Sequence, residues 1–216
     1  MLTKSQAKRN RDSDIGVAPV PATNDIEALR VAAKKCRACP LWKTGTQTVF
    51  GEGRPSAKII FVGEQPGDQE DRAGKPFVGP AGKLLDRALQ DAGVDRSKVY
   101  VTNAVKHFKW EPRGKRRLHK KPNAREIAAC RPWLEAEFDA LKPELIVCLG
   151  ATAAQSIFGP SIRVTKERGK ILVSPAGGKV LVTVHPSSLL RQPDEASRKI
   201  EYEKFVKDLG QVKKMS

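Results

Sequence analysis

The segment Lys58-Ile-Ile-Phe-Val-Gly63-Glu-Gln-Pro-Gly-Asp-Gln-Glu-Asp71 decides the fold, because an apolar run leads directly into a polar turn. The apolar run does not alternate with polar residues, which is typical of a strand that is covered on both faces. The glycines, proline and acidic residues that follow favour a loop at the carboxyl end of this strand. The segment therefore predicts a parallel sheet with a ligand-binding loop at one edge.

Further apolar runs predict three more strands, over residues 99–105, 144–150 and 179–184. Helical periodicity alternates with these runs over residues 24–36, 80–92, 123–141, 151–158 and 195–213, and residues 163–174 favour one or two short strands. Asn123 with Glu126 three residues later forms a capping-box pattern. This alternation indicates the α/β class, as a single domain with a mostly parallel central sheet and helices on both faces.

The amino-acid composition limits the classes of protein to which the chain can belong. The chain has 216 residues, of which 39% are hydrophobic, enough for the core of one domain over residues 24–216. Residues 1–23 have no regular apolar period, and we expect them to form a disordered leader. The chain has no apolar run of membrane-spanning length and no secretory signal. We therefore expect a cytoplasmic protein with reduced thiols, and a monomer, because no segment resembles an oligomerisation helix.

Positive charge is concentrated in one segment. The chain has 40 Lys and Arg against 24 Asp and Glu, a net charge of +16, and residues 106–125 hold nine basic residues and one acid. The same residues include Phe108, Trp110 and His119, with prolines and a glycine that favour a loop rather than a helix. Basic and aromatic side chains together suit phosphate contact and base stacking, although a solvated loop has a similar composition.

Polar residues follow each predicted strand, at the edge of the sheet where ligands bind. Glu64 follows the first strand, Asn103 ends the second, and His185 follows the last. His119 lies in the basic segment after the second strand. Each residue alone has a structural alternative, such as a helix cap or a turn, but their common placement indicates a site.

The four cysteines form a possible metal-binding set. Cys36 and Cys39 make a C-x-x-C, Cys130 lies in a predicted helix and Cys148 in a predicted strand. Four thiolates suit zinc or an iron–sulfur cluster, and the missing second C-x-x-C favours the cluster. Alternatively, Cys130 and Cys148 are small buried hydrophobic residues.

Several motifs together resemble the family-four uracil-DNA glycosylases of bacteria and archaea. These motifs are Gly63-Glu-Gln-Pro-Gly67, Gly74-Lys-Pro-Phe-Val-Gly-Pro-Ala-Gly82, Val101-Thr-Asn-Ala-Val-Lys106 and His185-Pro-Ser-Ser-Leu-Leu-Arg191. The cysteines are similar in order and spacing to the [4Fe–4S] ligands of that family. Two details resemble its UdgX-type branch: Gln65 stands where ordinary members have alanine, and Lys115-Arg-Arg-Leu-His119 is similar to a basic loop that ends in histidine.

The resemblance implies that uracil leaves the base stack and enters a pocket. Phe77 would stack on uracil, Asn103 would read its polar edge, and the backbone around Gly63 and Gln65 would close the pocket. His185 would stabilise the departing base, as an oxyanion donor does. Glu64 would stabilise the sugar cation or orient the nucleophile, with Asp68 and Asp71 as supporting acids.

The resemblance also implies the partner and the nucleophile. DNA, single-stranded by preference, would contact Lys115, Arg116, Arg117, Ser187 and Arg191. In the UdgX-type branch the loop histidine, here His119, attacks C1′ and stays bonded to the DNA, in a single turnover. An ordinary hydrolytic glycosylase would use water instead and leave an abasic site. Two other readings stay open: a non-catalytic binder of damaged or single-stranded DNA, and a metal-bound nucleotide or redox protein.

Overall fold

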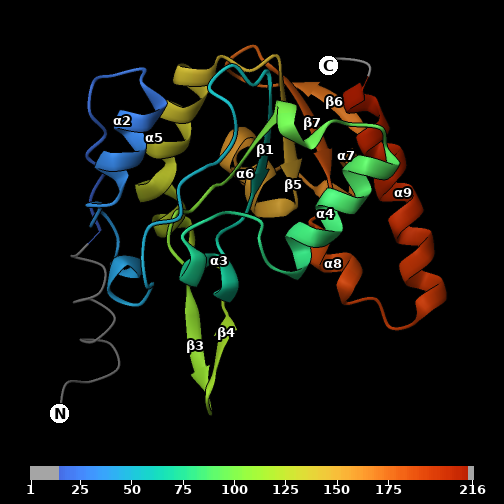
Figure 1. Cartoon of the computed structure of the whole chain (residues 1–216), viewed down its shortest axis with the longest axis horizontal. Coiled ribbons are helices and arrows are strands. Elements are labelled where there is room, and N and C mark those ends of the chain that lie inside the picture. The colour runs from blue at the N-terminus through green and yellow to red at the C-terminus, as the bar shows by residue number, and fades with distance from the viewer. Residues whose placement is uncertain (1–14, 214–216) are drawn as a thin grey trace.

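The computed structural model describes residues 15–213, and within them the chain forms one five-stranded sheet in the order β2-β1-β5-β7-β6 (Figure 1). The parallel strands are β1 (Ile59–Gly63), β2 (Val99–Asn103), β5 (Leu145–Leu149) and β7 (Lys179–Thr183). At one edge, β6 (Lys170–Val173) pairs antiparallel with β7. The predicted mostly parallel sheet is therefore confirmed.

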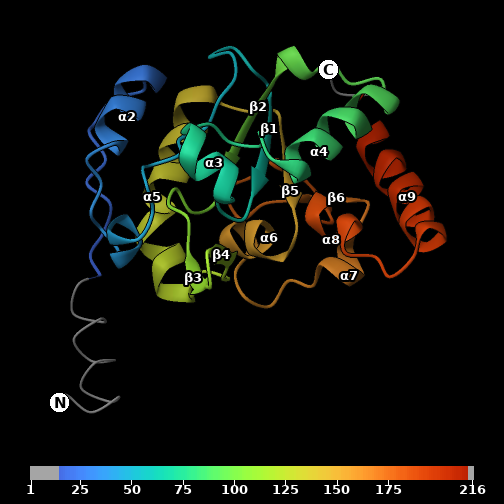
Figure 2. The ribbon, with the colours of Figure 1, turned by 60° about the horizontal axis from the view of Figure 1, so that its bottom comes forward.

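Helices cover both faces of the sheet, as predicted (Figure 2). One face packs on α2 (Ile26–Ala33), α5 (Ala124–Leu141) and α6 (Ala151–Phe158). The other face packs on α4 (Pro80–Asp91), α8 (Pro186–Leu190) and α9 (Glu195–Lys213). Alternate residues of β1 point to opposite faces: Ile60 and Val62 join the first core, and Ile59 and Phe61 join the second. An uninterrupted apolar strand is thus buried on both sides.

Side-chain caps mark the N-terminal ends of α5 and α2. The α5 capping box forms as predicted, with the Glu126 backbone N–H donating to Asn123 Oδ1 at 2.9 Å and the Asn123 N–H donating to Glu126 Oε2 at 2.7 Å. At α2 the N-cap is Asp25, whose carboxylate accepts the N–H groups of Glu27 and Ala28, so the helix begins at Ile26 rather than at residue 24.

Residues 106–125 do not form the predicted irregular loop. They include a β-hairpin, β3 (Trp110–Arg113) and β4 (Arg116–His119), which forms a separate two-stranded sheet and projects from the body of the molecule (Figure 1). Gly114 enables the tight turn with a φ of +58°. Pro112 is tolerated because a two-stranded hairpin has outer edges where no ladder N–H is required. Residues 163–174 also differ in part, since α7 (Val164–Glu167) precedes β6.

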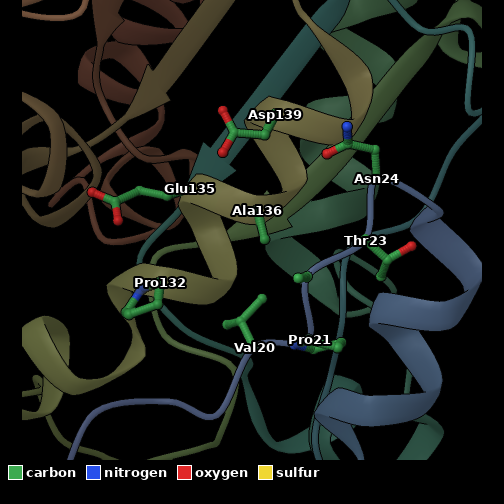
Figure 3. A pocket seen from close by; sticks show the side chains of 9 residues that line it. Val20, Pro21, Thr23, Asn24, Pro132, Glu135, Ala136 and Asp139 are labelled. Atoms are coloured by element: carbon green, nitrogen blue, oxygen red, sulfur yellow. The ribbon is translucent and has the colours of Figure 1, made fainter.

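Residues 15–23, which belong to the predicted leader, contact the domain. Ala18 is buried, and its N–H donates to the Ala129 carbonyl of α5 at 3.1 Å, while the Gly16 N–H donates to the Ala38 carbonyl at 2.7 Å. A hollow of about 530 Å³ separates Val20–Asn24 from Pro132 and Ala136 of α5 (Figure 3). Residues 1–14 of the predicted leader lie outside the described residues. In the described part of the chain no helix has the length and apolar character needed to cross a membrane.

Candidate active site

A cavity of about 990 Å³ opens at the carboxyl ends of the parallel strands. The short helix α3 (Asp68–Ala73), the hairpin and α8 contribute residues to its wall. The predicted residues that line it are Glu64, Gln65, Asp68, Phe77, Asn103, His119, His185, Ser187 and Arg191. The topology therefore brings most of the predicted site together, as expected for the loop edge of a parallel sheet.

Phe77 and Asn103 line the cavity and pack against Gly63. Gly63 and Asn103 are register partners on β1 and β2. A Cβ on Gly63 would lie 2.4 Å from Asn103 Oδ1 and 2.8 Å from Phe77 Cζ, so only glycine fits between the two side chains. Phe77 has a φ of +57°, a backbone conformation that costs energy for a non-glycine residue and is concentrated at functional sites. The ring is thereby held against the amide, next to a space open to a ligand.

Glu64 and His119 are neighbours in the lining of the cavity. His119 Nε2 at the end of β4 lies 3.4 Å from Glu64 Oε1, and the Thr152 hydroxyl of α6 donates to the other oxygen, Glu64 Oε2. Burial lowers the pKa of His119, an effect that the Glu64 carboxylate opposes and Arg191 reinforces. The imidazole is therefore neutral at pH 7 and keeps a nitrogen lone pair.

His185 is fixed as a hydrogen-bond donor. It caps α8, and the Ser187 backbone N–H donates to His185 Nδ1 at 3.2 Å. Burial first, with smaller effects of charge on His119 and Arg191, lowers the pKa of His185 to about 4. A neutral ring that accepts at Nδ1 carries its proton on Nε2. The Nε2–H is thus available to an acceptor in the cavity, and the Phe77 ring lies 6.2 Å away between centroids.

The Gln65 side chain holds the base of the hairpin. Its Nε2 donates to the carbonyls of Lys109 and Lys120, each at 3.1 Å, and its Oε1 accepts the Lys109 N–H at 3.0 Å. One amide therefore bonds both chains as they enter and leave the hairpin. An alanine here could make none of these bonds. The Gln65 side chain therefore holds the hairpin that carries His119, in addition to the pocket-closing role predicted for the Gln65 backbone.

Asp68, Asp71 and Arg117 form an ion-pair group behind the hairpin. Arg117 Nε lies 2.5 Å from Asp68 Oδ1, and Arg117 Nη1 lies 2.7 Å from Asp71 Oδ2. The Asp71 carboxylate is fully buried and also accepts from Thr46. Asp71 and Arg117 do not line the cavity, and their ion pair anchors β4. The roles of Asp71 as a supporting acid and of Arg117 as a DNA contact stay predictions.

Of the other predicted DNA contacts, Lys115, Arg116 and Arg191 are exposed and Ser187 is half-buried. Lys115 and Arg116 stand at the tip of the hairpin, away from the cavity, while Ser187 and Arg191 lie at its rim. Sequence reasoning missed Thr152 and Leu190, which also line the cavity. Thr152 is the second residue of α6, directly after the end of β5, a position that the strand-end rule selects.

The four cysteines are all buried and unpaired, and all belong to the core on the α5 side of the sheet. Burial raises the pKa of Cys39 to about 11 and of Cys130 to about 12, and Cys36 and Cys39 lie close enough to Cys130 to raise it further. Within residues 15–213, no three His, Cys, Asp or Glu side chains are grouped closely enough to hold a metal ion. The four thiols match an iron–sulfur cluster in number and type, because such clusters take four cysteine thiolates, but the described residues do not group them as its ligands.

The chain is similar to proteins of one enzyme superfamily. Residues 50–210 match the family described as the uracil DNA glycosylase superfamily. The type-4 uracil-DNA glycosylase of Thermotoga maritima is 40% identical over 190 residues, which cover 88% of this chain and 95% of that protein. The type-4 enzyme of Sulfurisphaera tokodaii is 38% identical, over 85% of this chain and 83% of that protein. The type-5 uracil-DNA glycosylase of Pyrobaculum aerophilum is 30% identical, over 76% of each.

Proposed function

The chain belongs to the uracil DNA glycosylase superfamily, and from this premise we propose that it excises uracil from DNA and captures the DNA through His119. One observation carries the second part: His119 Nε2 lies 3.4 Å from Glu64 Oε1 in the cavity that also holds Phe77 and Asn103. A nucleophile and a carboxylate thus share the space that a flipped nucleotide would enter.

Recognition would combine stacking with polar readout. The uracil ring stacks on Phe77, and the Asn103 amide both donates to and accepts from its Watson–Crick edge. Gly63 permits this approach because a larger residue would collide with both side chains.

Cleavage breaks the bond between C1′ and N1, and the electron pair of that bond leaves with uracil. The His185 Nε2–H donates to a uracil carbonyl and stabilises the developing negative charge, as an oxyanion donor does. The sugar becomes cation-like at C1′, and the Glu64 carboxylate, held by Thr152, stabilises it. A neutral His185 suits this role because an N–H donor does not require a charged ring.

Capture follows at the same carbon. A ring nitrogen of the neutral His119 shares its lone pair with C1′ and forms a C–N bond, and the alkylated imidazolium then loses its remaining N–H proton to solvent. The N-alkylated imidazole is a poor leaving group, so the adduct persists and the enzyme turns over once.

Ordinary hydrolysis is the second candidate, because the relatives named above are type-4 and type-5 uracil-DNA glycosylases. In that case water attacks C1′, and His119 only lines the cavity. Gln65 favours capture over hydrolysis, since it fixes the hairpin that places His119 beside Glu64.

We further propose that Cys36, Cys39, Cys130 and Cys148 hold a [4Fe–4S] cluster, which would tie residues 36–39 to α5 and β5 as a structural support. The partner is uracil-containing DNA, with single strands preferred because flipping then costs no base pair. The protein acts as a monomer in this proposal.

The test is incubation with a uracil-containing single-stranded oligonucleotide, followed by boiling and a denaturing gel. A shifted band that is absent with thymine in place of uracil supports capture. Strand cleavage after alkali without a shifted band supports hydrolysis. No uracil release at all excludes both candidates and favours a non-catalytic binder.

A further inference from the structure

A second aromatic and basic surface lies beside the hairpin, outside the cavity. We call it the Trp42 surface, and it consists of Arg37, Trp42, Lys43 and Trp110. Trp42 belongs to the short helix η1 (Pro40–Lys43), and Trp110 begins β3. Trp110 Nε1–H donates to the Thr44 carbonyl at 2.8 Å, so the segment after η1 is joined to the hairpin. Figure 1 shows this blue segment next to the base of the hairpin.

Cations accompany both rings of this surface. The Arg37 guanidinium carbon lies 4.6 Å from the centroid of the Trp42 ring, and Lys43 Nζ lies 5.8 Å from it. The Arg117 guanidinium carbon lies 5.5 Å from the centroid of the Trp110 ring. Both tryptophans remain partly exposed, whereas the third tryptophan of the chain, Trp133, is fully buried.

The chain segment that carries Trp42 has charge of one sign. From Ala28 to Gly51 the sequence has five basic residues and no acidic residue. Arg37 and Lys43 are exposed, and the hairpin continues the positive charge with Lys115 and Arg116. A guanidinium stacked on a ring can still donate from its edge, so Arg37 can hold a phosphate while it lies on Trp42.

We propose that the Trp42 surface binds the single-stranded DNA that flanks the uracil. One base stacks on Trp42, and Arg37 and Lys43 contact the neighbouring phosphates. Rings that alternate with cations are the arrangement by which proteins bind single strands without reading sequence. This proposal rests on the proposed function for the identity of the partner, and it adds a contact region that the uracil cavity does not include.

The main alternative is that Trp42 only shields Cys36 and Cys39 from water. That role would require the ring and its packing but no DNA. Equilibrium binding to a fluorescent 15-nucleotide oligothymidine separates the two roles, because this probe contains no uracil and forms no adduct. Binding is measured by anisotropy at several salt concentrations with the full chain.

The expected result is that Trp42→Ala weakens binding of the 15-mer by about tenfold, since each stacked base contributes measurably to affinity. Trp42→Phe keeps a stacking face and restores most of the affinity. Arg37→Gln leaves the ring in place and lowers the slope of log affinity against log salt by about one. The matched control is the double variant Lys199→Gln and Lys207→Gln, which removes two exposed charges from α9 and leaves binding near the wild-type value.

Wild-type affinity in both Trp42→Ala and Arg37→Gln overturns the proposal, and equal weakening by the α9 control overturns it as well. Thermal unfolding of each variant identifies a loss of folding, and Arg37→Gln keeps the test valid where Trp42→Ala is unstable. Uracil release from a short uracil oligonucleotide is measured separately. Failure of that reaction with normal 15-mer binding refutes the enzymatic proposal but not the Trp42 surface.

Discussion

Replacement of Gln65 by alanine isolates the contribution of hairpin placement to chemistry. The substitution deletes three hydrogen bonds that join the Gln65 amide to the backbone of Lys109 and Lys120. At about 0.5–1.5 kcal/mol each, these bonds stabilise the docked hairpin by about 1.5–4.5 kcal/mol. The ion pair from Lys109 Nζ to Glu126 Oε2 at 2.7 Å and the Arg117 group remain, so the lower end of this range applies.

A loss of about 1.4 kcal/mol in the docked state lowers the rate of a step that requires it by about tenfold. We therefore expect Gln65→Ala to slow adduct formation by about tenfold, because His119 leaves its position beside Glu64 more often. In the proposed mechanism uracil release depends on Phe77 and His185, to which Gln65 makes no hydrogen bond, so release should change less. The ratio of adduct to released uracil should fall accordingly.

The assay follows released uracil and the crosslinked band in the same single-turnover time course. Gln211→Ala is the matched control, since the Gln211 amide also donates to a backbone carbonyl, that of Gly169 at 2.7 Å, far along the chain from the hairpin. If Gln65→Ala forms the adduct at the wild-type rate, or loses both products equally, the positioning argument is refuted.

Four further outcomes follow from the same geometry. His119→Ser should abolish the heat-stable band on a denaturing gel while uracil release continues; a persistent band would exclude His119 as nucleophile. Adduct formation should be constant above pH 6.5 and fall as the pH drops through the lowered pKa of His119, which a pH–rate profile measures. Gly63→Ala should reduce uracil release by at least about 100-fold in a product assay, because its Cβ would lie 2.4 Å from Asn103 Oδ1. Burial lowers the pKa of His107 and His185 to about 4, below the value of about 6.5 expected in the unfolded chain. The free energy of unfolding should therefore fall by about 3 kcal/mol for each histidine as the pH drops from 6.5 to 4. Denaturant titrations of wild type and His107→Gln check this.

The strands and the longer helices could be predicted because their signals are local. An uninterrupted apolar run such as Ile59–Gly63 identifies a doubly buried strand, and Asn123 with Glu126 marks a helix start. Once four parallel strands are placed, their carboxyl ends bring Glu64, Asn103 and His185 to one edge without further information. That part of the site follows from topology alone.

The hairpin and its supports could not be predicted from local pattern. One proline, one glycine and dense charge between residues 110 and 119 obscure the alternation that marks a strand. The role of Arg117 depends on Asp68 and Asp71, which are 49 and 46 residues away in sequence. A charge run indicates a solvated or DNA-facing surface, but it does not indicate which of its members turns inward to a buried carboxylate. Only the tertiary structure makes that distinction.

A buried ion pair connects the cysteine region to the residue that would read uracil. Lys106 Nζ lies 2.6 Å from Glu137 Oε2 and donates to the Asn103 carbonyl at 2.7 Å, with both charged side chains almost fully inaccessible. The Lys106 backbone N–H donates to Cys130 Sγ at 3.2 Å. Cys130 and Glu137 are seven residues apart and share one face of α5.

Such a buried ion pair has a high desolvation cost, and an apolar pair of similar volume would often stabilise the fold to the same degree. What an apolar pair cannot do is hold the Asn103 carbonyl and the helix at a fixed separation through directed bonds. The amide of Asn103 is therefore placed with respect to α5 as well as to its own strand. Lys106 therefore contacts both Cys130 and the Asn103 carbonyl, and in the proposed mechanism a shift of α5 at Cys130 would change the position of the residue that reads uracil.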